Sequence, residues 1–116
     1  MWLRIFFRGL ETQIVMSNKK KLVRERFRNA VYARDKHSCV MCGKRNVPLD
    51  AHHITDRNEM PNGGYIPENG ISLCDECHIK AEQFHSTGVP FEGYSPDELY
   101  AKIGSSHEEA VRKDND

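Results

Sequence analysis

The chain has 116 residues, which favours a single domain, and only 38% of them are hydrophobic. Its mean hydropathy of −0.70 predicts a thin core that an additional staple would stabilise. No apolar run approaches the roughly 18–20 residues that cross a bilayer, so we expect no membrane partner.

The net charge of zero hides a strong asymmetry along the chain. Residues 1–50 hold 12 Lys and Arg against 4 Asp and Glu, whereas residues 51–116 hold 5 against 13. The basic excess concentrates in residues 19–36, with the sequence KKKLVRERFRNAVYARDK. Such a stretch is typical of a phosphate-binding surface, but a solvated helix face has the same composition.

Residues 1–16 differ in character from the sequence that follows. The segment MWLRIFFRGLETQIV is apolar and aromatic with scattered arginines, and it lacks the long apolar region and cleavage site of a secretory signal. Met16 opens a basic stretch and resembles a natural start. We expect residues 1–16 to be an extension that adds little to the fold; the alternative is a short amphipathic helix docked on the domain.

The central part of the chain predicts alternating helical and extended segments. Apolar residues at helical spacing predict a helix over 19–36, and VPLDAHHI predicts a strand over 47–54. A loop rich in Gly, Pro and Asn follows over 55–69. A short extended piece is expected over 70–74, and a second helix over 77–86 ends before a glycine.

The C-terminal part predicts one further helix and a tail. Ser95 is a helix N-cap, the next residue is proline, Glu98 completes a capping box, and Gly104 ends the helix. Residues 105–116 are polar and are expected to form a flexible tail. Residues 17–104 are then the folded domain.

Four cysteines occur as two CxxC pairs, Cys39 with Cys42 and Cys74 with Cys77. Structural zinc is held tetrahedrally, commonly by four thiolates, and each CxxC supplies two ligands from one short turn. Disulfides or free thiols are the alternative, and the absence of a secretory signal disfavours disulfides. We therefore predict a structural Zn²⁺ that pins the segment before the strand predicted over 47–54 to the start of the 77–86 helix.

The histidines suggest a second metal site. His52 and His53 are adjacent, and His78, Glu82 and His85 share one face of the 77–86 helix. Neighbouring residues of a strand diverge, so one histidine of the pair could hold a metal ion while the other acts as a base. A histidine pair on its own is more often structural, so the combination with the cysteines carries the inference.

The motifs CVMCG, LDAHHIT and ENGISLCDECH, in this order, resemble those of the HNH endonucleases, also called ββα-metal or His-Me finger nucleases. The resemblance covers about residues 24–86. It implies an α+β fold: a small zinc-stapled ββα-metal domain, here with an N-terminal basic helix and a C-terminal helical extension.

The resemblance also implies a role for individual residues. His53 matches the general base that activates water, and His52 and His78 match ligands of the catalytic metal. Asn69 matches the central asparagine, which orders the loop and the base. The structural zinc of one branch of the family implies that its ligands are Cys39, Cys42, Cys74 and Cys77.

One position departs from the family pattern. Many members carry a histidine four residues after the last motif histidine, where this chain has Glu82. A carboxylate suits a hard ion such as Mg²⁺ or Mn²⁺, so Glu82 is included as a candidate ligand, although it could equally be solvated. His85 is expected to lie at the surface or behind the ligands, and His37 and His107 at the surface.

The remaining expectations concern the core and the phosphate contacts. Arg57, Lys80 and the basic helix over 19–36 could contact phosphates of a DNA backbone, or could be solvated. The residues expected in the core are Phe27, Val31, Leu49, Ile54, Ile71, Leu73, Ile79 and Phe84.

Together these observations predict a metal-dependent HNH endonuclease that hydrolyses phosphodiester bonds in double-stranded DNA, with Mg²⁺, Mn²⁺ or Ni²⁺ as the catalytic ion. Two alternatives stay open: a zinc-stabilised module that binds nucleic acid or protein without catalysis, and a nicking subunit of a larger complex. A protein partner or a homodimer is compatible with either. By analogy with small HNH proteins, the expected location is the cytoplasm of a bacterial cell or a phage-infected host.

Overall fold

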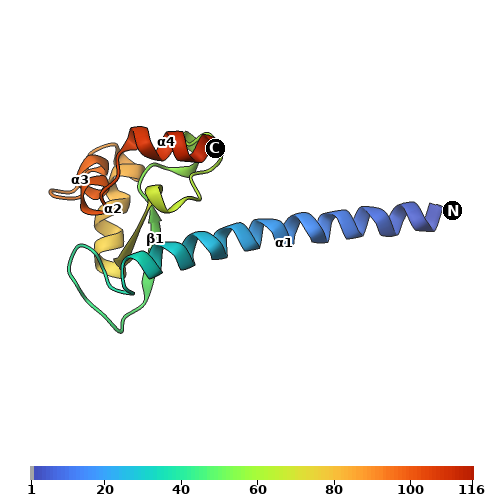
Figure 1. Ribbon diagram of the computed structural model, residues 1–116, viewed down its shortest axis with the longest axis horizontal. Helices are drawn as coiled ribbons and strands as arrows, with labels where there is room; N and C mark the ends of the chain where they lie inside the picture. Colours follow the sequence, from blue (N-terminus) through green and yellow to red (C-terminus); the bar gives the residue numbers. More distant parts are fainter. Residues whose placement is uncertain (1) are drawn as a thin grey trace.

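The computed structural model describes residues 2–116, and their side chains from Asn18 onward. Over this part of the chain the helices and strands follow one another in the order α1 (Trp2–Arg34), β1 (Leu49–His53), β2 (Gly70–Cys74), α2 (Asp75–Thr87), α3 (Pro96–Lys102) and α4 (His107–Asn115). Figure 1 shows α1 running out from a cluster that contains the sheet and the three later helices. Among the described residues, no helix combines the length and apolarity needed to cross a bilayer.

The two strands form an antiparallel sheet, and α2 follows directly from β2. The register pairs Leu49 with Cys74 and His53 with Gly70, so the start of β1 lies beside the end of β2. This ββα arrangement, together with the cysteine cluster described below, confirms the predicted α+β class and the zinc-stapled ββα fold.

The core lies between the end of α1 and the sheet, and between the sheet and the later helices. Every residue of β2 is buried, whereas β1 is buried only in part, because β2 is covered on both faces. Gly70 is needed at the start of β2: a Cβ there would lie 2.5 Å from Val31 and 2.7 Å from Phe27. The absence of a side chain at this point lets α1 pack directly on the sheet.

Polar contacts also hold α1 against the sheet. The guanidinium of Arg34 donates to the carbonyl oxygens of Pro67 at 2.7 Å and Gly70 at 2.6 Å. The carboxylate of Asp35 accepts from the backbone N–H of Ser72 at 2.9 Å. The last turn of α1 therefore fixes the strand that ends at the second pair of cysteines.

Most predicted elements are present, with shifted ends. The predicted strand over 70–74 has the bounds of β2, and Ser95 caps α3 by accepting from the N–H of Glu98. The strand expected over 47–54 is shorter, at 49–53. The helix expected over 77–86 begins two residues earlier and ends at Gly88, whose φ of 78° suits glycine.

The N-terminal helix differs most from its predicted length. Instead of a helix over 19–36 preceded by a separate extension, the backbone forms one helix, α1, from Trp2 to Arg34. Residues 1–16 are thus continuous with the basic helix from Trp2 onward, and their side chains lie outside the described residues.

Two expectations are wrong. Residues 105–116 were expected to be a flexible tail, but α4 occupies most of this segment, with Ser106 as its N-cap and Ala110 and Asp114 buried. Ile79 was expected in the core but is 72% exposed, because the face of α2 that packs inward carries Cys77 and Ala81 instead.

Candidate functional site

The four cysteines converge at one end of the sheet. Cys39 and Cys42 lie in the turn after α1, which the N–H of Gly43 closes by donating to the carbonyl of Cys39 at 2.8 Å. Cys74 ends β2, and Cys77 lies in the first turn of α2. The four sulfur atoms lie within 4.8 Å of one another, and the sulfurs of Cys42 and Cys74 are 3.6 Å apart.

The chemistry of this cluster fits a structural metal ion. All four cysteines are free thiols in the structure, and three of them are buried. Burial raises the pKa of the Cys77 thiol to about 12, so its thiolate form needs a cation beside it, whereas hydrogen bonds lower the pKa of Cys39 to about 7 although its burial acts the other way. The Tyr94 hydroxyl donates to the sulfur of Cys77 at 3.3 Å, as expected for a group that supports a ligand. The set matches the tetrahedral four-sulfur sites that hold zinc.

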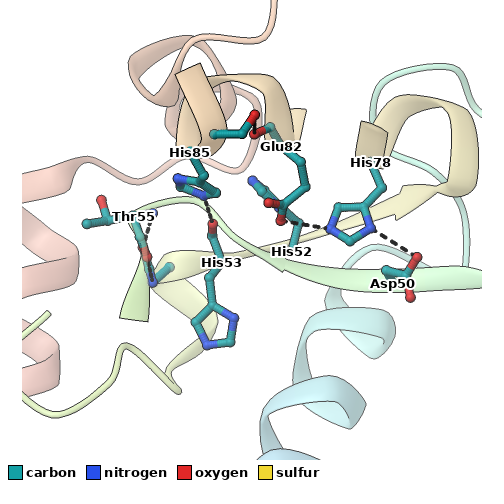
Figure 2. A network of polar contacts seen from close by, with 9 residues as sticks. Asp50, His52, His53, Thr55, His78, Glu82 and His85 are labelled. Atoms are coloured by element: carbon teal, nitrogen blue, oxygen red, sulfur yellow. Dashed lines mark hydrogen bonds and ion pairs between the residues drawn. The ribbon is translucent and has the colours of Figure 1, made fainter. Parts of the chain in front are cut away.

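A second cluster lies one turn further along α2. His52 on β1 and His78 on α2 both contact the same oxygen of Glu82, each through a ring nitrogen 3.1 Å away. Figure 2 shows Glu82 between the two rings. Each of the three residues offers one ligand atom, and these atoms lie within 4.8 Å of one another. The structure therefore brings together the three residues that the sequence predicted as ligands of a second metal.

The electrostatics of this cluster favour cation binding. The contact with His52 is the main reason that the pKa of Glu82 is lowered to about 2, so the carboxylate is ionised at neutral pH. Burial lowers the pKa of His52, so its ring is neutral there. One carboxylate and two imidazole rings form a nitrogen and oxygen donor set suited to divalent ions such as Mn²⁺ or Ni²⁺.

Two residues orient these candidate ligands. The other ring nitrogen of His78 lies 3.1 Å from a carboxylate oxygen of Asp50 on β1. His85 donates from Nε2 to the backbone carbonyl of His53 at 2.9 Å, and its ring centre lies 5.1 Å from that of His52 (Figure 2). Both contacts link β1 to α2. The contact between His78 and Asp50 is of the kind that fixes the orientation of a metal-binding histidine, whereas His85 holds the backbone of β1 beside α2.

His53 is turned away from this cluster. Its ring stacks on Phe27 with centroids 4.6 Å apart, and the Tyr65 ring lies nearly perpendicular to it with centroids 4.8 Å apart. Burial, and then the neighbouring His52, lowers the pKa of His53 to about 4. Its Nε2 is buried without a hydrogen-bond partner among the described residues. The ring is therefore neutral at pH 7 and able to accept a proton.

Asn69 does not line the cleft, although it was expected among the catalytic residues. It is fully buried, and its side-chain oxygen accepts from the N–H of Thr55 at 2.9 Å and from the Tyr100 hydroxyl at 2.7 Å. Its amide donates to the carbonyl oxygens of Thr55 and Gly64. These bonds hold Thr55, two residues after His53, against the loop at Gly64, so Asn69 lies behind the wall of the cleft.

A cleft of about 330 Å³ connects the histidines. Its walls are formed by Ala51, His52, His53, Asp56, Arg57, Tyr65, His78, Glu82 and His85. The sequence reasoning gave no role to Asp50 or Tyr65 and placed His85 at the surface or behind the ligands. No local pattern marks Tyr65 or Asp50, whereas the position of His85 on the His78 face of α2 did suggest its place.

The family comparison matches this part of the chain. Residues 39–84 match the family model described as HNH endonuclease. No curated protein and no solved structure gives a significant match. The matched segment spans both cysteine pairs, the sheet and most of α2, and it leaves out α1, α3 and α4.

Proposed function

We propose that the chain is a metal-dependent endonuclease that hydrolyses phosphodiester bonds in DNA, because residues 39–84 match the HNH endonuclease family model. One observation supports this above the others. A neutral imidazole, His53, and a cation-binding cluster of His52, His78 and Glu82 line the same cleft from different directions. Hydrolysis of a phosphodiester needs both a base and a site for positive charge on different sides of phosphorus.

The cluster of His52, His78 and Glu82 would hold the catalytic divalent ion, and Mg²⁺, Mn²⁺ and Ni²⁺ are the candidates. When bound, such an ion neutralises charge that develops on the phosphate and on the leaving 3′ oxygen. Asp50 would keep the ring of His78 oriented, and His85 would hold β1 against α2.

His53 would take the proton from the attacking water. Because Nε2 is buried, we assign this role to Nδ1, with the proton of the neutral ring carried on Nε2. The water oxygen bonds to phosphorus, the bond from phosphorus to the 3′ oxygen breaks, and the departing oxygen gains a proton from solvent. Proton transfer to a positioned base accelerates such a step by about 10²–10⁴-fold.

The cysteine cluster would act through structure. A Zn²⁺ bound by Cys39, Cys42, Cys74 and Cys77 fixes the start of α2 against the end of β2, and His78 is the residue after Cys77. The zinc therefore sets the position from which His78 and Glu82 reach the cleft.

Plasmid relaxation tests the proposal directly. Zinc-loaded protein is incubated with supercoiled DNA in Mg²⁺, Mn²⁺ or Ni²⁺ and without added metal, beside His53→Ala and His78→Ala. We expect nicking or linearisation by the wild type only with metal, and a loss of at least about 10²-fold in rate for His53→Ala. His37→Asn is the matched control, because His37 is exposed and its φ of 52° is one that asparagine tolerates.

The variants separate the alternatives. Equal cutting by wild type and folded His53→Ala would show that His53 is not the base. Inactivity of the wild type in every metal would favour a binding module or a subunit that cuts only with a partner. Calorimetric titration of Mn²⁺ adds a second readout, since His78→Ala should weaken binding while His53→Ala should not.

A further inference from the structure

A second hollow adjoins the cleft on the side of α1. It has a volume of about 420 Å³. One wall comes from α1 and the other from the segment between the strands, and the lining residues are Lys19, Lys20, Val23, Arg24, Arg57, Asn62 and Tyr65. We call it the basic groove, because the described residues that line it include four cations and no carboxylate.

The basic groove is continuous with the cleft. Arg57 and Tyr65 line both hollows. The edge of the Tyr65 ring packs on His53, while its hydroxyl accepts from Arg57 at 3.3 Å. A chain of phosphates whose reacting member lies beside His53 would therefore meet the groove on one side.

The geometry of α1 explains why these basic residues face the groove. Lys20, Arg24, Phe27 and Val31 recur at intervals of three or four residues and so share one face of the helix. The last two are buried against the domain, and Phe27 stacks on His53. The same face continues towards the N-terminus as the groove wall.

The other basic residues of α1 have different positions. Arg34 is bonded to backbone carbonyls at the end of the helix. Lys21, Arg26 and Arg28 are exposed and do not line the groove. The basic stretch therefore divides into a set that faces the groove and a set of equal charge on the same helix that does not.

We propose that the basic groove binds backbone phosphates of the DNA strand next to the phosphate that is cut. Lysine and arginine neutralise phosphates without reading bases, so the groove would supply affinity and register but no sequence preference. Since the chain as a whole carries no net charge, the attraction depends on this local grouping. The inference rests on the proposed nuclease function but assigns a site whose α1 wall lies outside the matched family segment.

A pair of charge-matched triple variants tests this inference. Lys19→Gln/Lys20→Gln/Arg24→Gln removes three groove cations, and Lys21→Gln/Arg26→Gln/Arg28→Gln removes three cations elsewhere on α1. Glutamine is uncharged and has nearly the helix propensity of lysine and arginine. Binding to a labelled DNA duplex is measured by fluorescence anisotropy across 50–200 mM KCl, without the catalytic metal, and plasmid nicking is measured alongside. Zinc content and circular dichroism show that each variant is folded.

We expect the groove variant to reduce the slope of log affinity against log salt by about two to three, and to weaken binding by on the order of tenfold or more at 100 mM salt. The control variant should change the slope by less than about one. If both variants lose equal affinity, or if the groove variant binds as the wild type does, the inference is wrong.

The same data separate this inference from the nuclease proposal. If the wild type cuts DNA and the groove variant binds DNA no more weakly than the control variant, the basic groove is not a phosphate site, while the nuclease function is supported. If only the groove variant loses DNA binding and no protein cuts the plasmid, the basic groove is a phosphate site but the proposed catalytic activity is wrong. If the wild type binds no DNA at any salt concentration, the proposal that the basic groove binds phosphates is wrong.

Discussion

The cysteine cluster and the histidine cluster occupy the same framework but differ in every property that decides what a metal site does. The cysteine cluster offers four sulfurs, three of them from buried residues. The histidine cluster offers two nitrogens and one oxygen and borders an open cleft. Closed four-sulfur sites stabilise folds, whereas sites with three protein ligands and an open position carry out reactions.

The two clusters are nonetheless linked by one helix turn. Cys77 and His78 are neighbours at the start of α2, and Glu82 follows one turn later. The position of Cys77 in the cysteine cluster therefore also determines where the side chain of His78 lies in the histidine cluster. In a chain with a small core, this arrangement lets the cysteine cluster hold the histidine cluster in place.

Removal of the structural metal should have the largest effect. Cys77→Ser deletes one ligand, and structural zinc contributes on the order of 10 kcal/mol to the folding of a small domain. We expect this variant to lose its cooperative thermal unfolding transition and most of its helical circular dichroism beyond α1. Treatment of the wild type with a strong zinc chelator should produce the same loss.

Re-addition of Zn²⁺ provides the control for that measurement. The chelated wild type should refold with zinc but not with Mg²⁺, while Cys77→Ser should not recover with either ion. A zinc-free protein that unfolds at the same temperature as the zinc-loaded one would contradict the structural role of the cysteine cluster.

The free energy of unfolding should depend on pH through His53, which lies beside the histidine cluster. The pKa of His53 is lowered from 6.5 to about 4 by burial and by His52, so the unfolded chain binds a proton more readily than the folded chain. The resulting stability is fully present above pH 6.5 and is lost as pH falls towards 4, with an upper limit of about 3 kcal/mol.

His53→Phe isolates this contribution. Phenylalanine keeps an aromatic ring between Phe27 and Tyr65 but cannot titrate. Urea unfolding of zinc-loaded wild type and variant at several pH values between 4 and 7 should show a smaller loss of stability on acidification for the variant. If the free energy of unfolding falls equally with pH in both proteins, the pKa of His53 is not lowered by burial in the folded state.

The sequence predicts local features of this chain well, because their causes are local. The two cysteine turns, the strand over 70–74 and the Ser95 cap each depend on residues within a few positions of one another. Spacing on a predicted strand and helix brought the candidate residues together, and the resemblance to the HNH endonucleases assigned His52 and His78 as metal ligands, with Glu82 as a further candidate. Their meeting at a shared carboxylate oxygen follows from the sheet register.

The features that the sequence does not predict depend on contacts between distant segments. Tyr65 packs on His53 only because the loop between the strands folds back onto β1. Ile79 is apolar, yet α2 turns it towards solvent. The last helix, α4, has little apolar surface, and its attachment depends on a buried carboxylate, Asp114, whose partners lie about 50 residues away.

Asp114 offers the smallest and most specific of these tests. Its carboxylate oxygen accepts from the backbone N–H groups of Asn62 at 2.7 Å and Gly64 at 3.1 Å, and it is 6% exposed. Gly64 in turn accepts from Asn69, and the next residue, Tyr65, packs on His53. Both N–H groups donate to the same oxygen, which asparagine can supply, so Asp114→Asn removes the negative charge that strengthens these two bonds, at a cost of about 1–3 kcal/mol.

We expect Asp114→Asn to lower the free energy of unfolding by that amount in urea titration, with Asp116→Asn, at an exposed position, as the control. The variant should also slow plasmid nicking while leaving Mn²⁺ binding unchanged, because Asp114 supports the Tyr65 side of the cleft and not the ligand side. If the two variants are equally stable, Asp114 does not hold α4 against the loop between the strands. Weakened metal binding in Asp114→Asn would instead mean that the two sides of the cleft move together, so the base and the metal cluster would not be independently supported.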